Sequence, residues 1–120
     1  MKFKDCFVGE DGNVWRASSL IKASKDFVVF SFDVSSVDQS EILRWKLVNL
    51  HDYLNHSRRV YDANLTTPII LRSDGYIMNG WHRVIKALYL KVKYLPAKQF
   101  KVDLEPDFSV EDSCSEEESI

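Results

Sequence analysis

The residues best suited to chemistry lie at a predicted helix start, Gly80-Trp81-His82-Arg83. A helix N-terminus presents backbone N–H groups that lack intrahelical acceptors, together with a partial positive charge. Gly80 has no Cβ, so an anion can approach this backbone closely. His82 and Arg83 add cationic side chains in a first turn where a cation is ordinarily unfavourable. This combination indicates an anion site, with phosphate as the natural ligand.

The three side chains of this motif have different predicted roles. Arg83 is predicted to contact phosphate, because the planar fork of a guanidinium matches that ligand. His82 either hydrogen-bonds the phosphate or is a structural histidine that orders the turn. Trp81 either stacks on a nucleotide base or packs at the surface of the domain. No catalytic residue is identified among them.

Arg58, Arg59 and Thr67 are predicted to contribute to the same anion site, because they precede the strands that lead to it. A solvated basic turn explains the two arginines as well as an anion site does. Thr67 has a high β propensity, which explains its position equally well.

Other polar residues have simpler interpretations. Asp62 and Asn64 are predicted as turn or cap residues, with a Mg²⁺ or ribose contact as the alternative. Asp74 is predicted as a turn residue. His51 and His56 have no third ligand nearby in the sequence, so no metal site is predicted.

A short strand pair is predicted to position the motif. The apolar run 69–71 and the run 76–78 flank Ser73-Asp74-Gly75, which is typical of a tight turn. A helix is predicted over 81–90 from its apolar spacing, and a last strand over 94–100.

The N-terminal half is predicted to hold a hairpin over 3–16, a short helix over 17–25 and a strand over 27–34. A further helix is predicted to begin with a capping box of Asp38 and Glu41. Four leucines at spacings of four, three and four predict a core-facing stripe on it: Leu43, Leu47, Leu50 and Leu54. The polar stretch 55–59 is predicted to break this helix, and 60–65 to form another turn. Pro68 predicts extended backbone over 66–68.

The composition is that of one soluble domain. The chain has 120 residues, with 45% hydrophobic and 28% charged residues. No apolar run or leader pattern predicts a membrane span or a secretory signal. Cys6 and Cys114 lie far apart in the sequence, which favours free thiols and a cytoplasmic protein.

Charge is divided unevenly along the chain. Residues 1–101 hold 16 basic and 10 acidic residues, a net of +6, whereas 102–120 hold eight acidic residues and no Lys or Arg. The sequence therefore predicts a single domain over 1–101 and a flexible, disordered acidic tail over 102–120. A basic domain admits polyanionic partners such as nucleotides or nucleic acid.

The stretch from Pro68 to Leu88 resembles the ParB N-terminal and sulfiredoxin-like superfamily, in particular its short single-domain ParB-like proteins from bacteria and their mobile elements. The family pattern is a strand pair followed by Gly-x-His-Arg at a helix start, with Ala a few residues on. Four residues match it: Gly80, His82, Arg83 and Ala87. Sulfiredoxins have a catalytic Cys where this chain has Trp81, so the resemblance does not extend to sulfiredoxin chemistry.

This resemblance implies a small α/β (α+β) domain, a mixed sheet packed with helices, that binds ATP or CTP, with or without Mg²⁺, through the Gly80–Arg83 motif. Weak NTPase or phosphotransfer activity is part of that implication. Two other interpretations stay open. One is an inactive protein-binding module that serves as an inhibitor, adaptor or immunity factor. The other is non-specific nucleic-acid binding or nuclease action.

Overall fold

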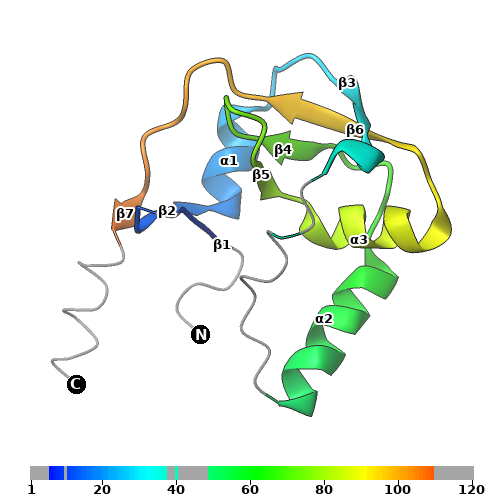
Figure 1. Cartoon of the computed structure of the whole chain (residues 1–120). Coiled ribbons are helices and arrows are strands. Elements are labelled where there is room, and N and C mark those ends of the chain that lie inside the picture. The colour runs from blue at the N-terminus through cyan, green and yellow to red at the C-terminus, as the bar shows by residue number, and fades with distance from the viewer. Residues whose placement is uncertain (1–5, 10, 38–39, 41–48, 110–120) are drawn as a thin grey trace, which may run out of the picture. The chain divides into compact units, whose positions relative to one another are not determined.

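The structure is a computed structural model that describes residues 6–9, 11–37, 40 and 49–109 (Figure 1). The chain contains both helices and strands, and the predicted α+β fold class is confirmed. The elements are β1 (Cys6–Val8), β2 (Asn13–Arg16), α1 (Ala17–Ala23), β3 (Phe30–Asp33), the 3₁₀-helix η1 (Val34–Ser36), α2 (Leu50–Asp62), β4 (Ile69–Leu71), β5 (Ile77–Asn79), α3 (Trp81–Leu90), β6 (Tyr94–Gln99) and β7 (Phe108–Ser109).

The backbone forms two compact units, each assembled from separate stretches of the chain. The first unit comprises the described residues within 1–27, 70–79 and 99–120. The second comprises those within 28–69 and 80–98. No helix in the described part of the chain is both long and apolar enough to span a bilayer.

The first unit is built around a three-stranded antiparallel sheet, β1–β2–β7, and α1. The pair β1–β2 confirms the predicted hairpin over its described residues, and α1 confirms the predicted short helix, although it ends at Ala23 rather than at residue 25. Six buried side chains form the core cluster of this unit: Phe7, Trp15, Leu20, Ile70, Met78 and Phe100. Burial of large apolar side chains is the main stabilising contribution, at roughly 1.5–3 kcal/mol each.

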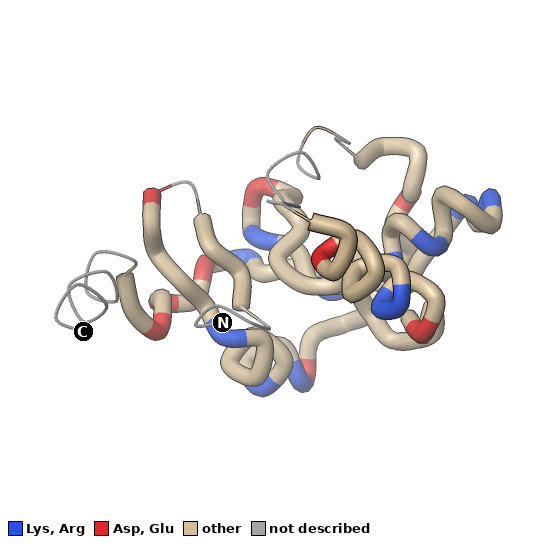
Figure 2. The backbone as a smooth tube through the Cα atoms, turned by 90° about the horizontal axis from the view of Figure 1, so that it is seen from below, with Lys and Arg blue, Asp and Glu red and all other residues tan. Residues whose placement is uncertain are grey.

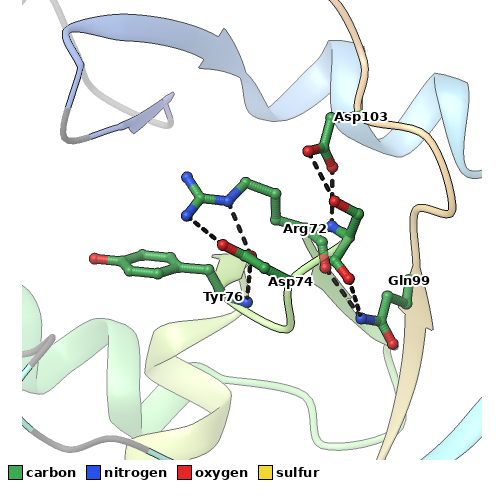
Figure 3. A network of polar contacts seen from close by, with 6 residues as sticks. Arg72, Asp74, Tyr76, Gln99 and Asp103 are labelled. Carbon is green, nitrogen blue, oxygen red and sulfur yellow. Dashed lines mark hydrogen bonds and ion pairs between the residues drawn. The ribbon is translucent and has the colours of Figure 1, made fainter.

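The β4–β5 hairpin of the first unit has the predicted tight turn (Figure 3). Gly75 has a φ of +91°, which a residue with a Cβ adopts only with strain. The Asp74 carboxylate accepts hydrogen bonds from Arg72, at 2.7 and 3.0 Å, and from the Tyr76 N–H. The Arg72 guanidinium lies 4.7 Å from the centre of the Tyr76 ring. Asp74 is thus a turn residue, as predicted.

Ordered structure continues past the predicted domain boundary at residue 101. The Asp103 carboxylate accepts hydrogen bonds from the backbone N–H and the hydroxyl of Ser73. The Trp15 indole donates to the Leu104 carbonyl at 2.8 Å. Acidic composition predicts a solvated tail. In the structure, however, the carboxylates of Asp103 and Asp107 accept hydrogen bonds from residues of the first unit. The rest of the predicted tail, 110–120, lies outside the described residues.

The second unit contains α2, α3, η1 and the antiparallel pair β3–β6. The helix α3 spans the predicted residues 81–90, and its inward face carries the buried Val84 and Ala87. It ends at Lys91 in the left-handed region, with a φ of +59°. Both α2 and η1 pack against α3.

The prediction for the helix before residue 55 is wrong in its core-facing stripe. The side chains of Leu50 and Leu54 are 71% and 57% exposed, and no residue of α2 is buried. Helical spacing shows that one face is apolar, but not that anything covers it. The predicted start at Asp38 and Glu41, with Leu43 and Leu47, lies outside the described residues.

The polar stretch 55–59 does not break this helix. It lies within α2, because polar residues without Gly or Pro are compatible with helical backbone. The helix begins after Asn49, whose side chain accepts from the Asp52 N–H at 2.9 Å, while the Asp52 carboxylate accepts from the Asn49 N–H. Of the predicted further turn at 60–65, only 60–62 is helical, as the end of α2.

Two loop predictions also change. The strand predicted over 27–34 begins only at Phe30, because the turn after α1 continues to Phe27, whose N–H donates to the Ser24 carbonyl. The stretch 66–68, predicted to be extended, begins in a turn. The Asn64 side chain accepts from the N–H and hydroxyl of Thr66, and the Thr67 N–H donates to the Asn64 carbonyl. Asn64 therefore has the predicted turn role.

The substitution Asp107→Ala is expected to destabilise the protein. Its carboxylate accepts from the Arg16 N–H at 2.7 Å and from the Ser19 hydroxyl at 2.9 Å, and both donors lose their acceptor. We expect a loss of about 1–3 kcal/mol in the free energy of unfolding, measured by urea denaturation. The control Glu105→Ala removes the same charge from an exposed position and should change stability by less than about 0.5 kcal/mol. Equal losses in the free energy of unfolding would contradict the conclusion that Asp107 stabilises the first unit through these hydrogen bonds.

Candidate functional site

The start of α3 depends on a close approach between Gly80 and Ile69 in the second unit. Gly80 is the N-cap residue and has a φ of +111°. A Cβ at this position would lie 2.5 Å from Cγ2 of Ile69 and 3.0 Å from Nη1 of Arg83. The sequence predicts a glycine that leaves room for an anion, whereas in the structure Ile69 occupies the space where a Cβ would project. Gly80 is therefore required for backbone conformation and packing.

The first turn of α3 has an electropositive character. The Gly80 carbonyl accepts from the N–H groups of Arg83 and Val84, at 2.9 and 3.1 Å. Gly80 contributes no side-chain cap, and the first turn has no acidic residue. The positive end of the helix dipole is therefore not offset by a carboxylate on α3 itself.

Arg83 joins the start of α3 to the residue before β4. Its Nη1 donates to the Pro68 carbonyl at 2.8 Å. The side chain is partly buried, and this burial lowers the pKa of the guanidinium, although an arginine still carries its charge at neutral pH. A guanidinium presents several N–H donors in one plane, so the same side chain can anchor to the protein and face a ligand.

His82 forms a hydrogen bond with His56 of α2. The distance between Nε2 of His82 and Nδ1 of His56 is 2.8 Å. The ring planes differ by only 19° and the ring centres are 5.1 Å apart, so the two nitrogens face each other between nearly parallel rings. Burial lowers the pKa of His56, and the charge of Arg59 lowers it further, while Asp52 opposes the shift. The charge of Arg59 therefore acts on His56.

The remaining predicted residues are placed as follows. Trp81 is partly buried in the first turn of α3. Thr67 is exposed in the turn that leads to Pro68. Arg58 is 84% exposed and lies 4.0 Å from the Asp62 carboxylate, one turn away on α2. The structure therefore joins the motif at the start of α3 to His56 of α2, on which the charge of Arg59 acts, while the described ion pair of Arg58 is with Asp62.

Basic and acidic residues are interspersed along the described part of the chain and are not gathered on one element (Figure 2). On α2, for example, Arg58 and Arg59 are balanced by Asp52 and Asp62. No group of three or more His, Cys, Asp or Glu in the described part of the chain could hold a metal ion.

His56 belongs to this site, although no sequence pattern predicts it there. Its partner His82 is 26 positions away in the sequence, and no spacing rule connects residues on two different helices. Its position on α2 requires the polar stretch 55–59 to be helical, whereas the sequence predicts a break there. Had the helix been predicted as continuous from 50 to 62, His56 would share a face with the apolar Val60, four residues on. That is the one sequence signal that it faces the protein.

Comparisons with protein-family models, curated proteins and solved structures yield no match to this chain. The chemistry of the site therefore follows from its own residues. They provide a helix N-terminus, a partly buried guanidinium and a hydrogen-bonded pair of imidazoles. This set suits recognition of an anion, and the imidazole pair can also accept a proton.

The substitution Gly80→Ala is expected to be much more destabilising than Gly75→Ala. Both glycines have a positive φ, so each substitution introduces backbone strain of about 1–2 kcal/mol. A Cβ at Gly75 meets nothing within 4 Å, whereas a Cβ at Gly80 meets Ile69. Overpacking should add roughly 1–3 kcal/mol at Gly80 alone, as measured by thermal and urea unfolding. Similar losses for the two variants would show that the contact with Ile69 is relieved at little cost.

Proposed function

We propose that the start of α3 binds the phosphate groups of a nucleotide, ATP or CTP. The observation that carries the proposal is a helix start that has no acidic residue in its first turn and holds the partly buried guanidinium of Arg83. Arg83 lies in the first turn, and His82 is bonded to His56, on which the charge of Arg59 acts. The positive end of the α3 dipole and the guanidinium groups of Arg83 and Arg59 have the same sign of charge, and a bound phosphate would offset it.

The resemblance to the ParB and sulfiredoxin-like superfamily is part of this proposal and rests on the same motif. Under it, Arg83 and the amides of the first turn contact phosphate oxygens, and His82 hydrogen-bonds one of them. Mg²⁺ would be held mainly by the phosphates, since the described residues include no metal-binding cluster. The proposal includes weak hydrolysis of the bound nucleotide or transfer of its phosphate.

Nucleotide binding is expected to raise the melting temperature of the protein, because a ligand that binds only the folded state stabilises it. The measurement is thermal shift with ATP, CTP and their diphosphates, each with and without Mg²⁺. Arg59→Ala should weaken binding about 5- to 30-fold, while Arg58→Ala, an equal loss of charge one position away, should change it less than about twofold.

Arg83→Lys tests the fork geometry with the charge retained, and isothermal titration calorimetry gives the affinity. We expect a loss of about tenfold or more. Unfolding curves without ligand separate weaker binding from a weakened fold. No stabilisation by any nucleotide at millimolar concentration would reject the proposal.

A second candidate function, a protein-binding module, is favoured by an apolar face on α2. Four large side chains on one side of this helix are exposed by 54–79%: Leu50, Tyr53, Leu54 and Tyr61. Exposed apolar residues that cluster on one helix face are typical of a docking surface for a partner. This α2 apolar face is distinct from the motif at the start of α3.

Leu54→Glu is expected to abolish partner binding if the α2 apolar face is the docking surface. A charge at this position lies in the middle of the face, and the fold should tolerate it because the residue is exposed. Proteins captured from a cell extract by the wild-type chain are compared with those captured by the variant. The control is Tyr89→Glu, which places the same charge at an exposed aromatic residue of α3. Capture of the same proteins by both variants would rule this surface out.

A further inference from the structure

The packing of α2 on α3 depends on polar contacts to an unusual degree. No residue of α2 is buried, and its larger apolar side chains are mostly exposed. Polar contacts to α3 include the His56–His82 hydrogen bond. They also include Lys86, whose Nζ donates to the Tyr61 and Ala63 carbonyls at 2.6 and 2.9 Å. Apolar burial therefore contributes little to docking, and the hydrogen bonds have a correspondingly larger share.

The His56–His82 bond exists only in certain protonation states. The two nitrogens face each other at 2.8 Å, so one must carry a proton and the other must accept it. A neutral pair and a singly protonated pair both satisfy this condition. When both rings are protonated, two N–H groups face each other, the hydrogen bond is lost and two positive charges repel.

The charged surroundings do not favour double protonation. On α2, Arg59 acts against a charge on His56 and Asp52 acts for it. On α3, Arg83 follows His82 directly, and Lys86 lies one turn further on. The element η1 also packs on α3, and the carboxylate of its capping residue Asp33 accepts from the N–H and hydroxyl of Ser35. The described cations around the pair are thus Arg59, Arg83 and Lys86.

We propose that the His56–His82 pair is a proton-sensitive latch that holds α2 on α3 at neutral pH and releases α2 in mildly acidic solution. This device does not require a nucleotide, although it shares His82 and Arg59 with the proposed nucleotide site. Its consequence is that acid frees a helix that carries the α2 apolar face and, at the same time, separates Arg59 from the start of α3.

The direction of the pH dependence follows from the lowered pKa of docked His56. Undocked α2 binds a proton more readily than docked α2, so acid favours the undocked state. Docking is fully supported above about pH 6.5, the ordinary imidazole value, and weakens as pH falls toward the lowered pKa. Between these two pKa values, one proton is taken up when α2 is released. The equilibrium constant for docking of α2 on α3 then falls by about tenfold per pH unit.

Amide hydrogen exchange of the full chain, followed by NMR between about pH 7.5 and 5, tests the latch. After correction for intrinsic rates, we expect the protection of α2 amides to fall about tenfold per pH unit below about pH 6.5. Amides of β2 in the first unit serve as the internal reference and should not follow this change. Parallel changes in α2 and β2 would overturn the proposal.

The variant His56→Gln removes the titrating ring and keeps a polar side chain. We expect low α2 protection already at pH 7.5 and no pH dependence of docking, whereas the control His51→Gln, on the same helix, should behave as the wild type. Retention of the wild-type pH profile in His56→Gln would overturn the proposal. If that variant fails to fold, ring nitrogen shifts of the wild-type chain decide. A proton shared between His56 and His82 supports the latch, and two rings that titrate as independent free imidazoles overturn it.

Discussion

The contact between Gly80 and Ile69 is the constraint on which the candidate site depends. Because no Cβ stands between them, the backbone turns into α3 directly against the first residue of β4. The same approach brings Arg83 within 2.8 Å of the Pro68 carbonyl. A single left-handed residue thus sets where the positive helix end, the guanidinium and the preceding turn lie relative to one another.

The two helices of the second unit are stabilised by different forces. The helix α3 buries Val84 and Ala87, so its position follows from apolar packing, which changes little with pH. The helix α2 buries no residue and is held by a pair of imidazoles and by a lysine on its terminal carbonyls. Polar docking of this kind is specific in geometry but sensitive to protonation.

Acidic residues have more than one role in this chain. Composition treats Asp103 and Asp107 as members of an acidic tail, yet both are acceptors for backbone N–H groups of the first unit. Asp74 and Asp52 likewise accept from the backbone at a turn and at a helix start. A carboxylate that satisfies backbone donors stabilises local structure, and its contribution is not visible in a count of charges.

The sequence by itself determined the elements whose signals are local: the buried run 69–71, the turn at Asp74 and Gly75, and the helix 81–90. Each is encoded within a few residues. The signals are contiguous apolar side chains for the strand, an Asp-Gly pair for the turn and helical spacing for the helix. Only the tertiary structure decided that His82 meets His56 and that Leu50 and Leu54 are exposed. Periodicity describes one helix, whereas contacts and exposure depend on which segments return to cover it.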